Sequence, residues 1–293
     1  MPSPSNDRAV HSAARALATQ ARRVRGLGGC APGGDAVAWA AHALHRALFA
    51  VGPTLAQDSA TALGDAIELL EPEICAAFLG HTQRTAATAR TRRAISALLR
   101  SLPAIQRTLL SDLEAAYERD PAATGPLEIV LCYPGLRALS VHRIAHALHV
   151  AGVPLIPRML AESAHDSTGI DIHPGATIGA GCFIDHGTSV VIGETSVIGK
   201  NCTLYQGVTL GARRFDRHAN GSIRRGTKRH PTLRDDVTVY ANATILGGAT
   251  VIGKGAVISA GVLVQESVPA HSIVKAPKME LVVAPRRRQS VKR

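Results

Sequence analysis

Residues 169–211 read GIDIHPGATIGAGCFIDHGTSVVIGETSVIGKNCTLYQGVTLG. In this stretch an aliphatic residue recurs every six positions, with one two-residue slip between positions 187 and 190. An α-helix would place apolar residues about every 3.6 positions and a half-buried strand every second position, so a sustained period of six fits neither. The period is typical of the hexapeptide repeat of a parallel β-helix, in which each repeat forms one short strand and one turn. The repeats start at Ile172, Ile178, Ile184, Ile192, Ile198, Leu204 and Leu210.

The repeat also predicts which residues fill the coil and how far it extends. Small residues four places after a start leave room for the stacked aliphatic side chains: Ala176, Cys182, Thr188 and Cys202. Residues 212–233 are polar, basic and out of register, so we expect a protruding loop. The period resumes at Tyr240, Leu246, Ile252, Ile258 and Val264, which gives twelve hexapeptides or about four coils. We therefore expect a β-helix domain over 169–268 and a basic, solvated tail over 269–293.

The residues before the repeats have a helical pattern, rich in Ala and Leu and poor in aromatic residues. Prolines punctuate this region at intervals that suit short packed helices, because proline disfavours a helix interior. We expect an all-α domain over 35–168, preceded by a flexible basic leader over 1–34. The predicted fold class is therefore α+β, with a helical domain followed by a parallel β-helix. The expected helices are Asp35–Val51, Leu55–Leu70, Arg92–Leu99, Pro103–Arg119, Gly135–Ala151 and Pro157–His165.

Composition and charge argue against several classes of protein. The chain has 293 residues, a formal net charge of +11 and few aromatic residues (one Trp, four Tyr and four Phe). Without a stacking platform or a zinc-finger spacing, this charge does not indicate nucleic-acid binding. No apolar run approaches the roughly 18 residues of a membrane span, and the start of the chain does not resemble a secretory signal. The cysteines are odd in number and scattered, which indicates reduced thiols and a cytoplasmic location: Cys30, Cys75, Cys132, Cys182 and Cys202.

Several short motifs follow one another in an order that resembles one enzyme family. They are ERDPAA at 118–123, HRIAHAL at 142–148, DIHP at 171–174, IDHGT at 184–188 and RHP at 229–231. In this order they resemble the serine O-acetyltransferases, and the long basic loop is similar to a subgroup with an extended loop. The resemblance implies transfer of an acetyl group from acetyl-CoA to the hydroxyl of L-serine, the first step of cysteine biosynthesis, without a metal. It also implies a left-handed β-helix that assembles as a trimer or as a dimer of trimers.

The resemblance assigns the base that this reaction requires. Attack of the serine hydroxyl on the thioester needs a group that removes the hydroxyl proton, and histidine suits the task because its unperturbed pKa is about 6.5. By the resemblance, His186 is that base, and Asp171 orients it and stabilises the imidazolium. The two residues are 15 positions apart, three short of an 18-residue coil, so the spacing neither confirms nor excludes their contact.

The resemblance also assigns the groups that bind L-serine. Arg229 and His230 should meet the serine carboxylate, since the guanidinium fork matches a carboxylate. Asp120 and Asp185 should receive the serine amino group. One residue departs from the family pattern, because Lys228 precedes the RHP motif where the family more often has an acid.

Two further expectations concern the acetyl donor and a protein partner. By the resemblance, coenzyme A lies along the coil beside Gly211 and Ala241, bound by backbone groups, with cations of the loop or tail near its phosphates. Many family members bind O-acetylserine sulfhydrylase by inserting a C-terminal isoleucine. The sequence ends in Val291, Lys292 and Arg293, so we do not expect that complex.

Other interpretations of these residues stay open. Three histidines at helical spacing could bind zinc, although HRIAH lacks the glutamate of the HExxH motif and packing is the expected role: His142, His146 and His149. The alternative functions are acetyl transfer to a sugar or an antibiotic, a non-catalytic scaffold, and a zinc lyase similar to the γ-type carbonic anhydrases with His173, His186 and His230 as ligands. Cys182 and Cys202 are expected to be small interior residues, so transfer should be direct, without an acyl-enzyme.

Overall fold

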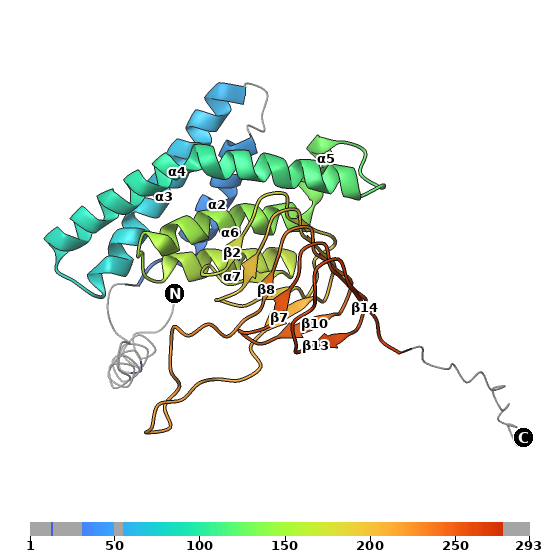
Figure 1. Cartoon of the computed structure of the whole chain (residues 1–293). Helices are drawn as coiled ribbons and strands as arrows, with labels where there is room; N and C mark the ends of the chain where they lie inside the picture. Colours follow the sequence, from blue (N-terminus) through green and yellow to red (C-terminus); the bar gives the residue numbers. More distant parts are fainter. Residues whose placement is uncertain (1–12, 14–30, 50–54, 278–293) are drawn as a thin grey trace, which may run out of the picture.

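The computed structural model describes residue 13, residues 31–49 and residues 55–277, and it has two layers (Figure 1). Helices form one layer and a coil of short strands forms the other, with a long loop that projects away from the coil. The expected leader over 1–34 and the end of the expected tail lie largely outside the described residues. The described helices are α2 (Gly34–Phe49), α3 (Leu55–Leu79), α4 (Arg84–Arg119), α5 (Pro126–Cys132), α6 (Pro134–Val150) and α7 (Ile156–Thr168).

The helices differ from the predicted ones mainly in length. Helix α3 continues through Pro72 and helix α4 through Pro103, where the sequence predicted breaks. A proline inside a helix removes one hydrogen bond to the carbonyl four residues earlier. Both prolines lie on exposed faces of their helices, where water can bond that carbonyl, so the helices continue. The short helix α5 was not predicted.

The second layer is a left-handed parallel β-helix, which confirms the predicted fold class. Its strands form three parallel sheets, here named by their order: sheet A is β1-β4-β7-β10-β13, sheet B is β11-β8-β5-β2 and sheet C is β14-β12-β9-β6-β3. The strands are β1 (Asp171–Ile172), β2 (Thr177–Ile178), β3 (Phe183–Ile184), β4 (Val191–Ile192), β5 (Val197–Ile198), β6 (Thr203–Leu204), β7 (Thr209–Gly211), β8 (Thr232–Leu233), β9 (Thr238–Val239), β10 (Thr244–Leu246), β11 (Val251–Ile252), β12 (Val257–Ile258), β13 (Leu263–Val264) and β14 (Ile273–Val274).

The interior of the coil follows the first run of repeats. All seven predicted starts from 172 to 210 are buried, and so are the small residues Ala176, Cys182 and Cys202. Thr188 was predicted to be interior but is exposed. Val190 takes the interior position instead, because the two-residue slip lengthens this turn and pushes Thr188 outward.

For the second run of repeats, the predicted interior positions were wrong by one residue at the start. Val239 and Ile245 fill the interior, whereas Tyr240 and Leu246 were predicted to do so. One extra residue in the turn after β10 restores the predicted register at Ile252. The coil is also longer than predicted, since β8 lies inside the expected loop 212–233 and β14 pairs with β12 beyond position 268.

A buried ion pair ties the helices to the first turn of the coil. The Arg143 guanidinium on α6 makes two hydrogen bonds of 2.9 Å to the Asp112 carboxylate on α4. The same guanidinium donates to the carbonyl of Ile178, and Asp112 accepts from the backbone N–H of Cys182. Helix α6 approaches so closely at Gly135 that a Cβ there would lie 2.1 Å from a backbone oxygen of β3. The two layers are therefore held in a fixed relation at the point where the site residues gather.

Candidate active site

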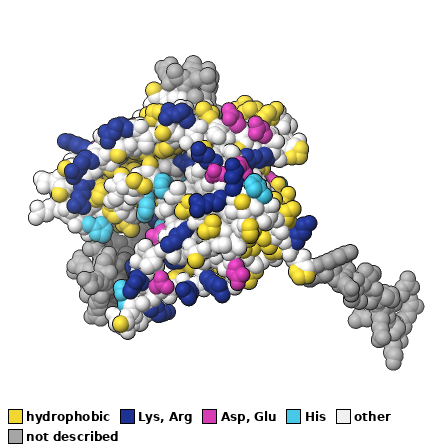
Figure 2. Space-filling model, viewed as in Figure 1, with side chains coloured by type: hydrophobic (Ala, Val, Ile, Leu, Met, Phe, Trp, Pro, Cys, Tyr) yellow, Lys and Arg dark blue, Asp and Glu magenta, His cyan; other side chains and the backbone are white. Residues whose placement is uncertain are grey.

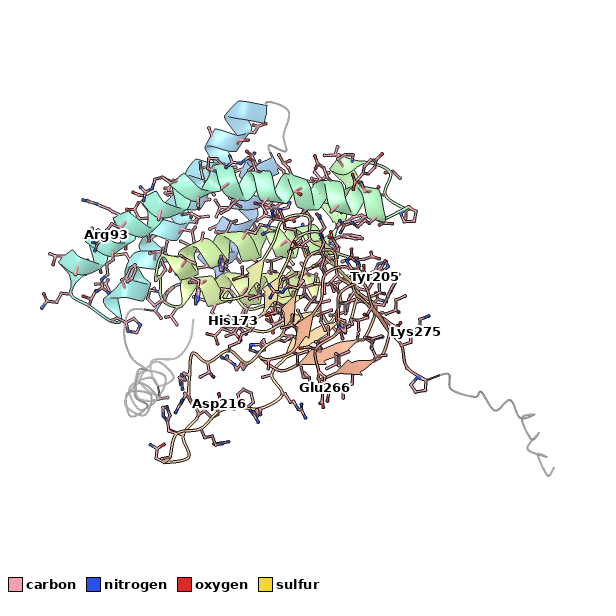
Figure 3. All side chains as sticks on the ribbon, viewed as in Figure 1. Arg93, His173, Tyr205, Asp216, Glu266 and Lys275 are labelled. Atoms are coloured by element: carbon pink, nitrogen blue, oxygen red, sulfur yellow. The ribbon has the colours of Figure 1, made fainter. Side chains whose placement is uncertain are left out.

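Most of the predicted site residues gather at two corners of the triangular coil. We call the turns that lead from sheet C to sheet A the CA corner; they include residues 185–190, 205–208 and 240–243. We call the turns from sheet A to sheet B the AB corner; they include residues 173–176, 193–196, 212–231 and 247–250. In Figure 3, His173 of the AB corner and Tyr205 of the CA corner lie on opposite sides of the coil.

The CA corner brings together His186, Asp185 and Asp120. His186 has a positive φ of 55° and an exposed side chain, and its Nε2 lies 3.7 Å from Asp185 Oδ2. The pKa of Asp185 is raised by burial and by the charge of Asp120, while the neighbouring His186 opposes the shift. The charge of Asp120 thus reaches Asp185, and two neighbouring carboxylates form a local site of negative charge, which suits a cationic group of a ligand.

Asp120 reaches this corner because the end of α4 is anchored on the coil. Arg119, the last residue of the helix, donates hydrogen bonds to the carbonyls of Gly181 (3.3 Å) and Asn201 (3.2 Å) and to the hydroxyl of Thr203 (3.1 Å). Asp120 follows as the first residue after the helix, with extended backbone. Its position is therefore fixed by the residue before it.

Tyr133 is a residue of this corner that the sequence did not reveal. Its hydroxyl donates to Asp120 Oδ2 at 2.5 Å, and the backbone N–H of Ala122 donates to Oδ1 at 2.8 Å. The tyrosine hydrogen bond is the main cause that lowers the pKa of Asp120, and the same bond raises the pKa of Tyr133 to about 12. The signal in the sequence is weak: a tyrosine between α5 and α6, 13 residues after the carboxylate to which it donates.

The AB corner holds His230 in a defined tautomer. The Nδ1 of His230 accepts a hydrogen bond of 3.1 Å from the backbone N–H of Thr195, whose hydroxyl also lies 2.9 Å away. The proton of the neutral ring is therefore on Nε2, which makes that nitrogen a donor. Burial, and then the charge of Arg229, lowers the pKa of His230 to about 4. The ring is neutral at physiological pH.

Arg229 and Lys228 have different roles at the AB corner. The Arg229 guanidinium forms an ion pair with Glu194. Burial would raise the pKa of Glu194, but its hydrogen bond and ion pair with Arg229 outweigh burial and lower it. The Lys228 ammonium instead donates to the carbonyls of Thr195 (2.5 Å) and Pro231 (3.3 Å). Lys228, the residue that departs from the family pattern, thus stabilises the backbone around the RHP motif through these hydrogen bonds. The acidic partner of Arg229 is Glu194.

The remaining predicted residues are not adjacent within one chain. Asp171 opens β1 and lies 3.9 Å from the guanidinium of Arg158, and the described residues show no contact between Asp171 and His186. Gly211 ends β7 beside the AB corner, whereas Ala241 precedes β10 at the CA corner. The orienting role of Asp171 and the placement of coenzyme A stay predictions.

The helix histidines considered as zinc ligands differ in exposure, and His149 is exposed. His142 is buried, and Nδ1 of His146 lies 2.8 Å from the carbonyl oxygen of Pro174. His173 and His230 share the AB corner, but His186 lies at the CA corner. Among residues 31–49 and 55–277, no three His, Cys, Asp or Glu side chains are grouped so that they could hold a metal ion.

The two cysteines of the coil are interior residues, as predicted. Cys182 and Cys202 are both fully buried. Burial raises the pKa of Cys182 well above its ordinary value and that of Cys202 to about 11. Because the thiolate is the nucleophilic form, neither thiol is suited to form an acyl-enzyme.

Comparison with known proteins decides the family. The family model "Serine acetyltransferase, N-terminal" matches residues 72–141, and the model "Hexapeptide repeat of succinyl-transferase" matches residues 189–213. The crystal structure of Entamoeba histolytica serine acetyltransferase 1 in complex with L-cysteine superposes with a TM-score of 0.72 and 37% identity, over 81% of this chain and 86% of that chain. The chain belongs to the serine acetyltransferase family.

Two other members of the serine acetyltransferase family show how far the likeness extends. The plasmid-encoded serine acetyltransferase of Synechococcus elongatus is 54% identical over 147 residues, which are 50% of this chain and 46% of the relative. The crystal structure of the Neisseria gonorrhoeae enzyme in complex with serine has 29% identity and a TM-score of 0.55, over 81% of this chain and 95% of that chain. The chain spans about half the length of the first curated relatives it matches. None of its described helices is long and apolar enough to cross a membrane.

Proposed function

We propose that the protein is a serine O-acetyltransferase, which transfers the acetyl group of acetyl-CoA directly to the hydroxyl of L-serine. The observation that supports this most is the CA corner, where an exposed histidine lies beside a pair of carboxylates. His186 removes the hydroxyl proton as the serine oxygen attacks the thioester, and the thiol of coenzyme A leaves. Asp120 and Asp185 hold the ammonium group of serine, so that its hydroxyl faces the imidazole.

The serine carboxylate needs donors that the CA corner does not supply. The AB corner has them: the guanidinium of Arg229 and the Nε2–H of a neutral His230. Within one chain His186 lies before the strands of sheet A and these donors lie after them, so sheet A separates the two groups. In a three-fold assembly the CA corner of one protomer can face the AB corner of the next, so each complete active site would lie between two protomers.

The AB corner also suits the phosphates of acetyl-CoA. A cavity of about 420 Å³ lies between the loop and the coil, and its lining includes Arg213, Arg214 and Lys228. Cationic side chains of this kind bind phosphate groups. Gly211 ends the neighbouring strand β7, next to the start of this loop. This cavity is where the coenzyme would be held.

The activity is tested by following thiol release from acetyl-CoA with and without L-serine. We expect serine-dependent release, and a loss of roughly 10²- to 10⁴-fold in turnover for His186→Ala, the usual effect of removing a general base. His218→Ala is the matched control, because His218 is an exposed histidine of the protruding loop. A loss below tenfold for His186→Ala would remove His186 from this role. Thiol release with an amino sugar or homoserine, and none with serine, would overturn the acceptor.

Mixing two inactive chains tests whether the site lies between protomers. His186→Ala and Arg229→Ala chains should each be nearly inactive alone. In randomly mixed trimers, a site that takes one residue from each of two neighbours has both wild-type residues in about a quarter of cases, so about a quarter of the activity should return. If both residues act within one chain, mixing restores nothing, and the inter-protomer site is wrong.

The location and the sulfhydrylase partner rest on the sequence. Residues 278–293, which carry the C-terminal end considered for the sulfhydrylase contact, lie outside the described part of the chain. A cytoplasmic location is consistent with the four described cysteines, which are all free. We keep the cytoplasmic location as part of this proposal, and the absence of the sulfhydrylase complex stays an expectation from the sequence.

A further inference from the structure

A second cavity lies in the helical layer, far along the chain from the motifs of the active site. It has a volume of about 690 Å³ and lies between the first half of α4 and the turn after α6. We call it the α4 arginine groove and define it by Arg90, Arg93, Ala97, Arg100 and Gly152. Its size is within the usual range of sites for small molecules, about 300–1,000 Å³.

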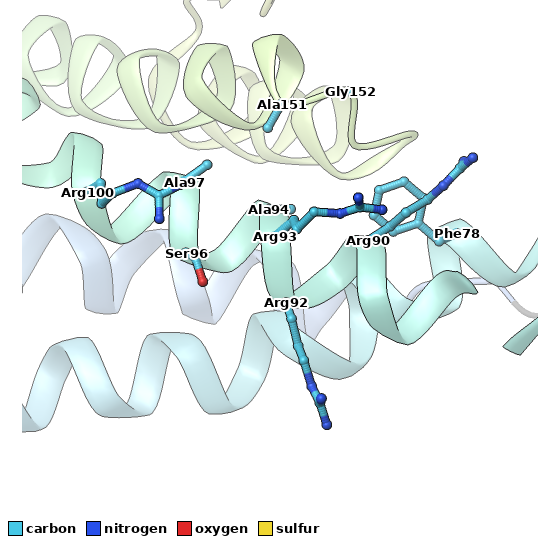
Figure 4. A pocket seen from close by; sticks show the side chains of 10 residues that line it. All are labelled: Phe78, Arg90, Arg92, Arg93, Ala94, Ser96, Ala97, Arg100, Ala151 and Gly152. Atoms are coloured by element: carbon cyan, nitrogen blue, oxygen red, sulfur yellow. The ribbon is translucent and has the colours of Figure 1, made fainter. Parts of the chain in front are cut away.

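The side chains of the groove are arranged around an open centre. Arg90, Arg93 and Arg100 are spaced by three and seven residues, which places them on one face of the helix. Between them Ala94 and Ala97 leave the floor free of bulky side chains. Figure 4 shows Ala151 and Gly152 across the groove from this face, and Arg92, which also lines the cavity, extends away from them.

The charge of this part of the helix is not compensated within the described chain. Residues 84–111 contain six arginines and no acidic residue. None of these arginines forms an ion pair with a described residue. Figure 2 shows Lys and Arg side chains gathered at this end of the helical layer. Like charges three or four residues apart destabilise a helix, so an anion bound among them would relieve the repulsion.

One arginine is also held in place by an aromatic ring. The guanidinium carbon of Arg90 lies 5.9 Å from the ring centroid of Phe78, a cation–π arrangement. This contact keeps Arg90 at the edge of the groove rather than free in solvent. A guanidinium that is already positioned loses less freedom when it binds a phosphate, for which its planar fork is well matched.

We propose that the α4 arginine groove binds a small molecule that carries two or more phosphate groups. Three guanidinium groups around one cavity can each bond a different phosphate oxygen. A monoanion would leave most of this charge unneutralised, and a long polyanion would extend beyond the cavity. The site is separate from the acetyl-transfer site and does not depend on the proposed function.

Calorimetric titration of the full chain with inorganic pyrophosphate tests the proposal. We expect saturable binding at 150 mM salt, weakened about tenfold or more by Arg93→Gln or by Arg100→Gln, as expected for loss of a charge-assisted hydrogen bond. Arg107→Gln is the matched control, because it removes the same charge from the same helix at an exposed position that does not line the groove. Circular dichroism of each variant confirms that the fold is retained.

Three outcomes would overturn the proposal. One is the absence of saturable binding at millimolar pyrophosphate. Another is an equal loss with Arg107→Gln and Arg93→Gln, which would indicate general charge attraction. The third is binding of hexaglutamate without binding of pyrophosphate, which would indicate an acidic peptide instead. Titration with ADP and with coenzyme A in the Arg93→Gln background separates the sources of phosphate, since only a ligand of the groove should lose affinity in that variant.

Discussion

Replacing Tyr133 with phenylalanine tests whether the hydrogen bond to Asp120 positions the serine site. The change removes one hydroxyl, which donates to Asp120 Oδ2 at 2.5 Å, and leaves the ring in place. A hydrogen bond to a charged group contributes about 1.5–3 kcal/mol. Because Asp120 is partly open to water, we take the lower end, about 1.5 kcal/mol, which corresponds to roughly a tenfold change in binding.

The expected effect of Tyr133→Phe is on serine binding and not on the chemical step. Without the hydroxyl, the pKa of Asp120 rises toward its ordinary value of about 3.9, so the carboxylate stays ionised at pH 7.5. The loss is therefore one of position, and the KM for L-serine should rise roughly tenfold with little change in kcat. The KM for acetyl-CoA should not change.

Steady-state kinetics at pH 7.5, with each substrate varied in turn, measure this split. Tyr117→Phe is the matched control, because Tyr117 is an exposed tyrosine of α4 and has no hydrogen bond to a described residue. An unchanged KM for serine in Tyr133→Phe would refute the positioning role. A fall in kcat with an unchanged KM would show that Asp120 acts in the chemical step instead.

Two other predictions concern the junction between the layers. Asp112→Ala should lower the free energy of unfolding by about 3–5 kcal/mol in urea denaturation, since it leaves the buried Arg143 without its partner; a loss below 1 kcal/mol would contradict this. Burial, with the charges of Arg143, His146 and His173, lowers the pKa of His142 well below 6.5. The unfolded chain therefore binds more protons below pH 6.5, so stability should fall as the pH drops from 7.5 to 5.5. His142→Gln should reduce that fall, and an equal fall in both proteins would refute the assignment.

The fold could be predicted from the sequence because the coil repeats an aliphatic residue every six positions. Every sixth residue faces the interior, so the run from Ile172 to Leu210 fixes strands and turns together. The errors came where a turn changes length. The extra residues near Thr188 and after Leu246 do not change the residue types of the repeat. Which of two adjacent residues faces the interior there is visible only in the packed structure.

The helical layer was less predictable, because whether a helix continues through a proline depends on the exposure of that position. Pro72 and Pro103 look like breaks in sequence, yet each faces solvent inside a continuous helix. The exposed face depends on which neighbours pack against the other side. That information is tertiary, and it is absent from the local pattern.

For the active site, the sequence supplied residue types but not their grouping. Asp120, Asp185 and His186 come from two layers and meet at one corner, while Arg229 and His230 gather at another. Tyr133 could not be found from spacing, because its partner lies beyond an intervening helix. The split between corners follows from the triangular section of the coil, which the period of six predicts only as a repeat length.

The close packing of the helices on the first turn of the coil has a consequence for the solution behaviour of the protein. Strands β1, β2 and β3 are the terminal strands of their three sheets, and an open terminal strand is a template for pairing with another chain. Arg143 bonds the carbonyls of Ile178 and Gly179 at this end, and α6 and α7 lie against it. The helical layer thus acts as the end cap that a solenoid needs to stay discrete, and it prevents coils from stacking end to end into fibres.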